Sequence, residues 1–363
     1  MNKNFFIQII IVVLFSAQIV FPRLPYDFSI LNTKTKIVPI VGIGAGPAGL
    51  MAASYAARSK LETVIITGDT LGGQLTGAGE VENMPGLKVS LGADIVKNLE
   101  DQARDFGAHF IEDSVESVDF SSWPFEIKLT GGDTITALAV IIATGAAPRK
   151  LGIPGELEYW GSGVSACAIC DCFMFKNRNV AIVGGGDAAI EQALHLAPYA
   201  KNITIFVRKD YMRAAGRMQD KIESYDFINV VYNKEVLRVF GDGQVVTGLE
   251  LLDTITQETS NVPIDGLFLA IGHNPNTGIF APYLKLSEHG YIVLDTRSQE
   301  TSTEGIFAAG DVADYRFRQA GIATGSGIQA ALEAIDFLRE INFNNKVNDS
   351  IKSLLYSSIN RDR

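Results

Sequence analysis

All three cysteines of this 363-residue chain lie within six consecutive positions, in the stretch SACAICDC at residues 165–172. Two residues separate Cys167 from Cys170, and Asp171 and Cys172 follow directly. A disulfide that closes so short a loop removes little entropy from the unfolded chain, which disfavours a structural role. We therefore expect the cluster either to bind a metal ion or to carry out redox chemistry.

A redox couple explains the cluster better than a zinc site does. Structural zinc takes four ligands, whereas the cysteines supply three. The histidines lie far from the cluster in sequence and show no ligand spacing: His109, His195, His273 and His289. A thiol–disulfide couple instead needs bridging cysteines, a source of electrons and an acid–base group. We expect no metal here.

Asp171 and Cys172 each have two interpretations. Beside a thiol pair, Asp171 is a candidate acid–base group that protonates a departing thiolate and deprotonates an incoming thiol. The alternative is a surface aspartate at the start of a helix. Cys172 is either a small buried side chain or an alternative disulfide partner, and the sequence leaves both choices open.

A first glycine-rich loop indicates a dinucleotide site. Gly44, Gly46 and Gly49 follow an apolar run that begins at Lys36, and an alanine-rich helical segment and a second apolar strand come next. This strand–turn–helix–strand order is the context that the G-x-G-x-x-G fingerprint requires. The glycines let the backbone approach a pyrophosphate, while the helix N-terminus supplies amide donors.

A second loop of the same kind contains Gly184 and Gly186 and follows the apolar strand 180–183. About 20 residues after such a loop, an acidic residue binds a ribose 2′-hydroxyl, whereas a cation accommodates a 2′-phosphate. Basic residues occupy that place here: Arg208, Lys209 and Arg213. The second loop therefore favours NADPH over NADH, the alternative being a solvated strand end.

Two dinucleotide folds in one chain imply two dinucleotides, and a flavin reduced by a nicotinamide is the simplest pairing. Apolar strands that end in glycine turns recur at 140–148, 267–277 and 305–320, and Asp311 follows the last of them. A carboxylate just past a strand end can accept hydrogen bonds from a sugar-alcohol chain. The sequence thus predicts an α/β protein with two Rossmann-like domains.

The chain from about Lys36 to Leu338 closely resembles the low-molecular-weight, bacterial-type thioredoxin reductases of the pyridine nucleotide-disulfide oxidoreductase family. The stretches that carry the resemblance are GAGPAG, TGDTLGGQLTGAGEVENMPG, ATGAAP, GVSACAICD, VAIVGGG, AIGHNPNT, FAAGDV and FRQA. It implies an FAD-binding domain of residues 36–149 and 276–340, of the three-layer ββα type. An NADPH-binding domain, residues 150–275, is inserted into it and carries the cysteine pair. Residues 1–35 and the polar tail 341–363 fall outside the pattern.

The resemblance also implies site residues and a reaction. FAD would lie against Gly44, Gly46, Gly49, Thr67, Gly72, Gly73, Gln74, Asn83, Gly310, Asp311, Arg318, Gln319 and Ala320. NADPH would lie against Gly184, Gly186, Arg208, Lys209 and Arg213. Hydride passes from NADPH to FAD, and the electrons then reduce a Cys167–Cys170 disulfide whose Cys170 faces the flavin. Cys167 attacks oxidised thioredoxin or a thioredoxin-like protein, and Asp171 is the acid–base group. Family members form homodimers and rotate one domain against the other during turnover.

Three positions depart from the family pattern. The basic motif usually begins His-Arg-Arg, whereas Val207, Arg208 and Lys209 stand here. Lysine meets a phosphate as a point charge without the bidentate fork of arginine, so the expected NADPH preference is softened. Cys172 replaces the usual glycine.

Other functions fit the sequence less well. The flavin subunit of a peroxide-reducing system carries an additional N-terminal redox domain, for which the 35 residues before Lys36 are too few. Ferredoxin reductases of similar build lack the paired cysteines. A membrane-tethered redox sensor that binds FAD and NADPH, or a reductase for another thioredoxin-like or peroxiredoxin partner, stays an alternative.

Composition and the N-terminal segment limit the possible partners and the cellular location. A net charge of −10 and a pI near 5.0 argue against nucleic acid as a partner. Residues 5–21 form an uncharged apolar run of 17 residues, at the short edge of what spans a bilayer. An uncleaved membrane anchor and an upstream start codon both stay open, and a signal peptide is disfavoured because no small-x-small cleavage site follows. NADPH chemistry and the absence of structural disulfides favour a cytoplasmic catalytic body.

Overall fold

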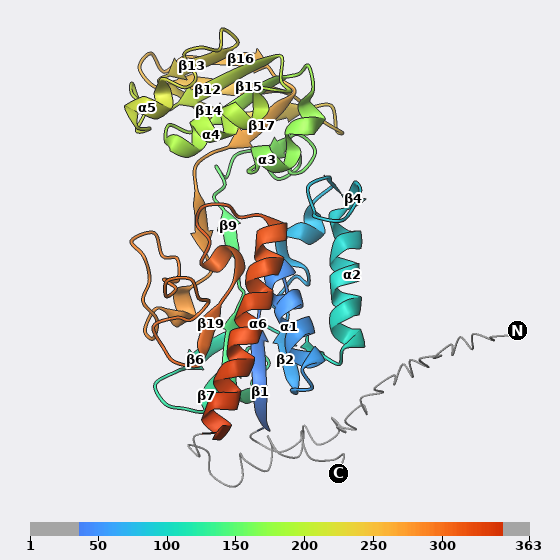
Figure 1. Cartoon of the computed structure of the whole chain (residues 1–363). Helices are drawn as coiled ribbons and strands as arrows, with labels where there is room; N and C mark the ends of the chain where they lie inside the picture. The colour runs from blue at the N-terminus through green and yellow to red at the C-terminus, as the bar shows by residue number, and fades with distance from the viewer. Residues whose placement is uncertain (1–35, 344–363) are drawn as a thin grey trace, which may run out of the picture. The chain divides into compact units, whose positions relative to one another are not determined.

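The computed structural model describes residues 36–343, which form two α/β domains around separate sheets (Figure 1). The expectations for the apolar run 5–21 and for residues 344–363 lie outside the described residues. Helix α6 continues to Phe343, three residues past the boundary expected at 340. Within residues 36–343, no helix combines the length and the apolar character that crossing a membrane requires.

The first domain is built on a seven-stranded sheet. In spatial order its strands are β5 (His109–Ile111), β2 (Thr63–Ile66), β1 (Lys36–Ile43), β8 (Thr134–Ile142), β7 (Phe125–Leu129) and β6 (Val115–Asp119), with β19 (Ile306–Ala308) paired to β8. β7 is antiparallel to β6 and to β8, and the other pairs are parallel. After its first residue β8 is buried throughout, as expected for a strand covered on both faces.

Helices cover one face of this sheet. The helices are α1 (Pro47–Arg58), α2 (Gly92–Asp105) and α6 (Ala320–Phe343). Buried alanines, among them Ala48, Ala52 and Ala330, form one cluster with Leu138 and Ile141 of β8. Such small side chains let α1 and α6 approach each other and the sheet closely. Close packing here fixes the start of α1, where the first glycine loop ends.

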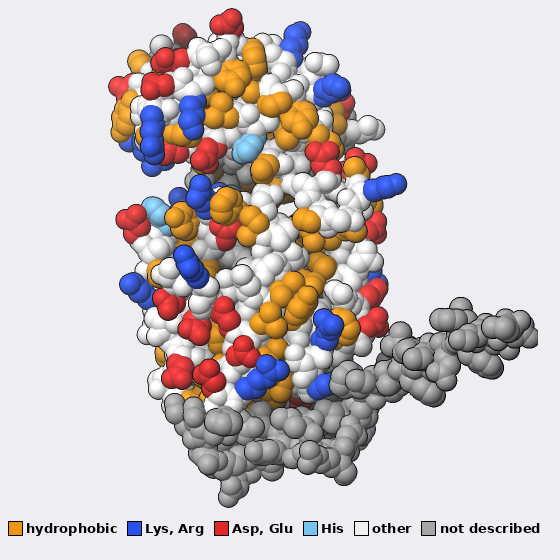
Figure 2. All heavy atoms as spheres, in the orientation of Figure 1, with side chains coloured by type: hydrophobic (Ala, Val, Ile, Leu, Met, Phe, Trp, Pro, Cys, Tyr) orange, Lys and Arg blue, Asp and Glu red, His pale blue; other side chains and the backbone are white. Residues whose placement is uncertain are grey.

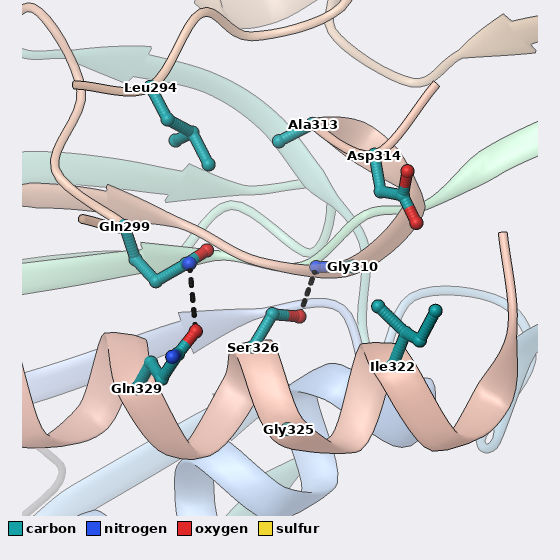
Figure 3. A pocket seen from close by; sticks show the side chains of 9 residues that line it. All are labelled: Leu294, Gln299, Gly310, Ala313, Asp314, Ile322, Gly325, Ser326 and Gln329. Atoms are coloured by element: carbon teal, nitrogen blue, oxygen red, sulfur yellow. Dashed lines mark hydrogen bonds between the residues drawn. The ribbon is translucent and has the colours of Figure 1, made fainter. Parts of the chain in front are cut away.

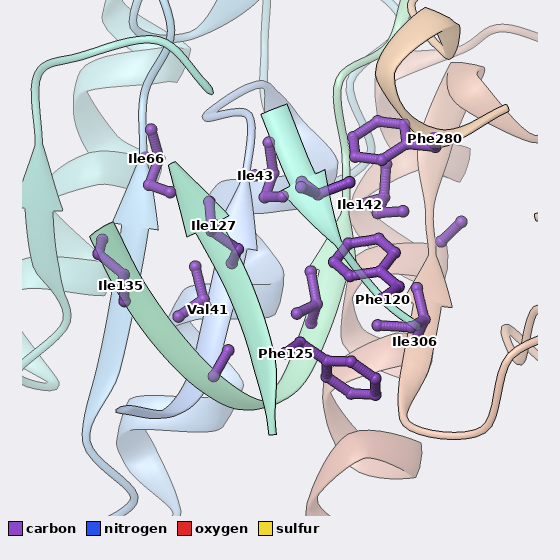
Figure 4. Packing of buried hydrophobic residues seen from close by; sticks show 14 of the residues in the cluster. Val41, Ile43, Ile66, Phe120, Phe125, Ile127, Ile135, Ile142, Phe280 and Ile306 are labelled. Carbon is purple, nitrogen blue, oxygen red and sulfur yellow. The ribbon is translucent and has the colours of Figure 1, made fainter. Parts of the chain in front are cut away.

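At the β8 edge of the sheet, the antiparallel strands β6 and β7, here called the ribbon, pack against the other face of the parallel strands (Figure 4). Phe125 and Ile127 of β7 pack in one buried cluster with Val41 and Ile43 of β1, and Phe280 closes its edge (Figure 4). The β7 strand alternates buried and exposed residues, the pattern of a strand with one face in a core. Ribbon, parallel sheet and helices thus make the three ββα layers expected for the flavin domain.

The inserted domain has a five-stranded parallel sheet and a smaller antiparallel one. In spatial order the parallel strands are β10 (Val164–Ser165), β17 (Gly266–Leu269), β11 (Asn179–Val183), β12 (Asn202–Val207) and β13 (Ile228–Tyr232). The antiparallel strands are β14 (Lys234–Gly241), β15 (Val246–Asp253) and β16 (Thr259–Pro263). The helices are α3 (Ala168–Asp171), α4 (Asp187–Leu196) and α5 (Gly216–Gln219). Apolar clusters lie on both faces of the parallel sheet.

Two short strands connect the domains. The chain leaves the first domain after β9 (Ala146–Pro148) and returns through β18 (His273–Pro275), and the two strands pair antiparallel. The second sheet is therefore inserted into the chain of the first, as the resemblance implied. The remaining short elements are β3 (Glu80–Val81), β4 (Ser90–Leu91) and the 3₁₀ helices η2 (Gly73–Gly77), η3 (Cys172–Phe175), η4 (Gly278–Phe280) and η5 (Gly310–Val312).

Candidate active site

The cysteine pair forms a disulfide at the start of a short helical segment. Cys167 precedes α3 and Cys170 lies within it, with an S–S distance of 1.97 Å and a Cα–Cα distance of 5.3 Å. The backbone N–H groups of Cys170 and Asp171 both donate to the carbonyl of Cys167, at 3.2 Å each. This tight turn brings the two sulfurs together, which fits a redox disulfide. Among residues 36–343, no cluster of His, Cys, Asp and Glu could hold a metal ion.

Cys172 is a free thiol in the core of the inserted domain. It is 7% exposed and packs in the cluster that contains Phe175, Ala189 and Ile190. Burial raises the pKa of its thiol, and nearby Glu82 and Asp171 add to the shift. A buried thiol with a raised pKa is a poor nucleophile. These observations favour the interpretation of Cys172 as a small core side chain.

Asp171 is partly buried beside the disulfide. Burial raises the pKa of its carboxyl above the usual value, and a hydrogen bond from Ser165 opposes the shift. The Ser165 hydroxyl oxygen also accepts the N–H of Cys167 at 2.9 Å. One buried serine at the end of β10 thus contacts both the acid–base candidate and the first cysteine. Our sequence reasoning missed Ser165, because nothing in its sequence position distinguishes it.

The first glycine loop fits a pyrophosphate. A Cβ on Gly44 would lie 2.4 Å from the carbonyl oxygen of Ala143, and one on Gly49 would lie 1.8 Å from that of Gly44. Both positions therefore require glycine. Gly46 is the N-cap of α1, without a side-chain cap, and a Cβ there would meet no protein atom within 4 Å. Open space in front of the first amides of a helix is what an anionic group needs.

Other predicted FAD residues gather around this loop. The N–H of Gly72 donates to Ala45 at 2.8 Å, and a Cβ on Gly73 would lie 3.6 Å from Cα of Gly46. The Gln74 side chain donates to the carbonyl of Ala146 at 2.6 Å. Thr67 is buried directly after β2. The segment 67–74 is thereby held against the loop, as the FAD assignment needs.

Asp311 supplies a half-buried carboxylate in η5, three residues after β19 ends. Burial raises its pKa to about 6, while Asp314 adds to the shift and Arg318 opposes it. Carboxylates kept from water are stabilised by hydroxyl donors, so this position fits the sugar-alcohol chain of a flavin. Ala320 begins α6, and Arg318 and Gln319 lie directly before it. These predicted FAD residues thus lie on one continuous segment.

A cavity of about 440 Å³ lies beside this segment (Figure 3). Ile322, Ser326 and Gln329 of α6 line it, together with Gly310 of the predicted FAD set. The N–H of Gly310 donates to Ser326 Oγ at 2.9 Å, and the Gln299 side chain donates to that of Gln329 at 3.1 Å. Ser326 thereby fixes the backbone next to Asp311, which sequence reasoning did not foresee.

A second cavity, of about 430 Å³, is lined by four of the five predicted NADPH residues. Its lining includes Gly184, Arg208, Lys209 and Arg213, with Tyr211 and Lys234 in addition. Gly186 is the uncapped N-cap of α4, and a Cβ there would meet no protein atom within 4 Å. Lys and Arg side chains also gather on the inserted domain near α5 in the space-filling view (Figure 2). The arrangement fits a nucleotide with an added phosphate.

Tyr211 and Lys234 were missed by the sequence reasoning. Lys209 Nζ donates to the Tyr211 hydroxyl at 3.0 Å and lies 5.1 Å from the centre of its ring. Lys234 forms a 2.8 Å ion pair with Asp253. Lys234 comes from β14, far from the glycine loop in sequence, so no local pattern could have placed it in this cavity.

The structure also brings a predicted FAD residue to the disulfide. Gln319 Nε2 lies 3.9 Å from Cys167 Sγ and 4.0 Å from Cys170 Sγ. Asn83, another predicted FAD residue, donates to Gln319 Oε1 at 3.3 Å. The candidate flavin residues and the candidate redox pair therefore meet in one site.

Comparisons with known proteins agree with this geometry. Residues 38–327 match the family model described as pyridine nucleotide-disulphide oxidoreductase. The chain is 43% identical over 301 residues to a thioredoxin reductase of Rickettsia typhi, covering 82% of this chain and 97% of that relative. It is 42% identical over 309 residues to one of Streptomyces coelicolor, covering 85% and 96%.

Solved structures give the same result. Thioredoxin reductase from Giardia duodenalis has a TM-score of 0.79 at 39% identity, covering 84% of this chain and 99% of that one. The enzyme from Streptococcus pyogenes has a TM-score of 0.80 at 32% identity, with the same coverage. This chain belongs to the pyridine nucleotide-disulphide oxidoreductase family.

Proposed function

We propose that this protein is an NADPH-dependent, FAD-containing thioredoxin-disulfide reductase. The observation that carries the proposal is the Cys167–Cys170 disulfide, which lies beside Asp171 and in contact with Gln319 of the flavin segment. Two glycine loops with open space at Gly46 and Gly186 support two dinucleotides in the same chain. The identity to thioredoxin reductases over most of the chain supports the same conclusion.

FAD supplies a two-electron carrier between NADPH and the disulfide. When the disulfide accepts an electron pair, its S–S bond breaks, one sulfur takes up a proton and the other remains a thiolate. Asp171 directly follows Cys170, and its raised pKa keeps a larger fraction of its carboxyl protonated than usual. It can therefore deliver that proton and later recover it.

Exchange with the partner then follows from the chemistry of the pair. The Cys167 thiolate attacks one sulfur of the partner's disulfide, a mixed S–S bond forms, and the partner's other sulfur leaves as a thiolate and takes a proton. Cys170, deprotonated by Asp171, attacks the Cys167 sulfur. This step re-forms the Cys167–Cys170 bond and releases the partner's second sulfur, so the partner gains the electron pair.

Exposed apolar side chains flank the disulfide and fit a protein substrate. Ile169 lies between the two cysteines and is 44% exposed, and Met174 follows them and is 46% exposed. Apolar side chains of this kind can be buried by a docked partner, since protein interfaces are enriched in such contacts. A small disulfide protein such as thioredoxin fits this face.

Further features of the proposal come from the family. We infer a homodimer, as in the family. We also infer a cytoplasmic catalytic body, because NADPH and reduced thioredoxin occur inside the cell. Ile322 and Leu332 on α6 are exposed apolar residues that a second copy could cover. Sedimentation equilibrium at the monomer mass would contradict the dimer. The membrane tether through residues 5–21 stays a prediction, testable by N-terminal mass determination on native material.

The proposed function has a direct test. The purified protein should be yellow, oxidise NADPH, and do so repeatedly only when an oxidised thioredoxin is present. A redox sensor would instead react once and stop. Absence of flavin, or a single turnover with thioredoxin in excess, would contradict the reductase assignment. Replacing thioredoxin with an oxidised peroxiredoxin in the same assay tests the alternative partner.

Arg208 should govern the choice of nicotinamide cofactor. Arg208→Ala is expected to raise KM for NADPH by about 10- to 100-fold, since a hydrogen bond to a charged group contributes about 1.5–3 kcal/mol. KM for NADH should barely change, because NADH has no 2′-phosphate. Steady-state kinetics with both cofactors measure the effect.

Arg217→Ala is the matched control for this experiment. Arg217 is an exposed arginine on α5 and is not among the residues that line the cavity. Its replacement should leave both KM values unchanged. An equal increase in KM for NADPH and NADH in Arg208→Ala would show that Arg208 does not read the phosphate.

A further inference from the structure

One side-chain amide contacts both sulfurs of the redox disulfide. Gln319 Nε2 lies 3.9 Å from Cys167 Sγ and 4.0 Å from Cys170 Sγ, and both distances are within the reach of an N–H···S hydrogen bond. Gln319 directly precedes α6 in the flavin domain, whereas the cysteines belong to the inserted domain. This contact joins residues that lie about 150 positions apart in the chain.

Neighbouring groups fix which end of the amide faces the sulfurs. Asn83 Nδ2 donates to Gln319 Oε1 at 3.3 Å. The carbonyl oxygens of Phe317 and Arg318 each accept from Gln319 Nε2 at 3.2 Å, so the two Nε2 hydrogens are shared between these carbonyls and the sulfurs. A flipped amide would place its oxygen against these two carbonyls and its NH₂ group against the Asn83 donor. Both contacts would be repulsive, so the NH₂ end faces the disulfide.

The strength of the hydrogen bond from Gln319 to the sulfurs changes during the reaction. Sulfurs in an intact disulfide are neutral and accept hydrogen bonds weakly. Once the S–S bond breaks, one sulfur carries a full negative charge, and hydrogen bonds to an ionised acceptor are roughly twice as strong. A donor that is already in place when charge develops lowers the barrier more than it stabilises the starting state.

Two acidic groups lie close to this segment of the chain. Asp171 follows Cys170 directly, and Glu82 is close enough to raise the pKa of neighbouring Cys172. When ionised, both carboxylates disfavour a thiolate nearby. A neutral N–H donor opposes their effect without adding a charge that would pair with Asp171.

We propose that Gln319 is a catalytic residue whose Nε2–H stabilises the thiolate left when the Cys167–Cys170 bond breaks, with Asn83 positioning its amide. The inference rests on the proposed function, in which the reduced flavin supplies the electron pair. The S–S bond breaks, and each sulfur becomes a thiolate, one holding the added electron pair and the other the former bonding pair. One thiolate stays hydrogen-bonded to Gln319, and the other takes a proton from Asp171. No covalent bond to Gln319 forms or breaks.

The test is the pKa of the reduced cysteine pair, read from the pH dependence of its alkylation by iodoacetamide. The holoenzyme is first reduced with dithiothreitol, so neither NADPH nor a partner protein is needed. Gln319→Leu removes the donor at similar volume and should raise the lower thiol pKa by about one unit, because the charged form loses a hydrogen bond. Gln319→Glu replaces the donor with a carboxylate and should raise the lower thiol pKa further.

Two further variants sharpen the result. Asn83→Leu removes the donor that holds Gln319 Oε1 without adding a charge and should raise the same pKa by a smaller amount. Gln102→Leu makes the matched glutamine change at an exposed position of α2, outside the predicted site residues, and should leave the pKa unchanged. Flavin content and the rate of flavin reduction by NADPH are recorded for each variant. A variant that keeps its flavin and shows the shift supports a direct effect on the thiol.

An unshifted pKa in Gln319→Leu would overturn the proposal, whatever its turnover. Should Gln319→Leu lose its flavin, Asn83→Leu decides by the same criterion, because neither variant adds a charge. Failure of the wild-type protein to turn over with thioredoxin would count against the reductase assignment alone. The thiol pKa is measured without thioredoxin, so the two failures are distinguishable.

Discussion

Replacing Cys170 with serine is expected to abolish reduction of the partner disulfide while FAD reduction by NADPH continues. A hydroxyl cannot form the disulfide that accepts the electron pair, and Cys167 alone cannot resolve a mixed disulfide with the partner. We expect turnover with thioredoxin to fall on the order of 10³-fold or more, as when an essential nucleophile is removed. Stopped-flow absorbance of the flavin and steady-state oxidation of NADPH separate the two half-reactions.

Cys172→Ala is the matched control, because it removes the third thiol of the same segment. Cys172 is buried and outside the disulfide. Turnover should therefore match the wild type, and reduction of the Cys167–Cys170 disulfide should release the same number of new thiols. Its loss from the core should lower the free energy of unfolding by about 1 kcal/mol. Sustained thioredoxin reduction by Cys170→Ser, with loss in Cys172→Ala, would reassign the redox partner to Cys172.

Asp171→Asn should slow disulfide turnover by about 10²- to 10⁴-fold, the range for loss of a general acid–base group. The asparagine keeps the size of the side chain and can still hydrogen-bond Ser165, but it cannot exchange a proton with the cysteines. Flavin reduction by NADPH should stay normal. Asp226→Asn, an exposed aspartate in the same domain, is the control and should leave both rates unchanged.

The same substitution should change how stability depends on pH. Burial raises the pKa of Asp171 in the folded protein, so its folded state binds the proton more tightly than the unfolded chain does. That contribution to stability is complete below the unfolded pKa and is lost as pH rises through the folded pKa. Asp171→Asn should therefore be more stable than the wild type at neutral pH. Urea denaturation at pH 5 and at a higher pH measures the difference, and a less stable variant would contradict the burial of this charge.

Local sequence patterns predicted the parts of the site that are local in the chain. The glycine loops could be recognised because a tight turn at Gly44 and an uncapped helix start at Gly46 depend on neighbouring residues. The cysteine spacing likewise determines that Cys167 and Cys170 can meet. The basic residues after the second loop could also be predicted, because they stand at a fixed distance along the chain from its glycines.

Contacts between distant segments could not be predicted in this way. Gln319 reaches the disulfide across the boundary between the two domains, and Lys234 enters the cavity of the predicted NADPH residues from a strand of the antiparallel sheet. Ser165 is an ordinary buried serine until the fold places its hydroxyl between Cys167 and Asp171. The role of each depends on which segments pack together, which residue periodicity does not specify.

The central claim is that the Cys167–Cys170 disulfide exchanges electrons with a flavin bound in the same chain. Anaerobic titration of the holoenzyme with dithionite, followed by flavin absorbance and by alkylation of new thiols, tests it most directly. The wild type should take up two electron pairs per chain, one into the flavin and one into the disulfide, and Cys170→Ser should take up one. A wild-type protein that takes up a single pair, with its disulfide intact when the flavin is fully reduced, would contradict the claim.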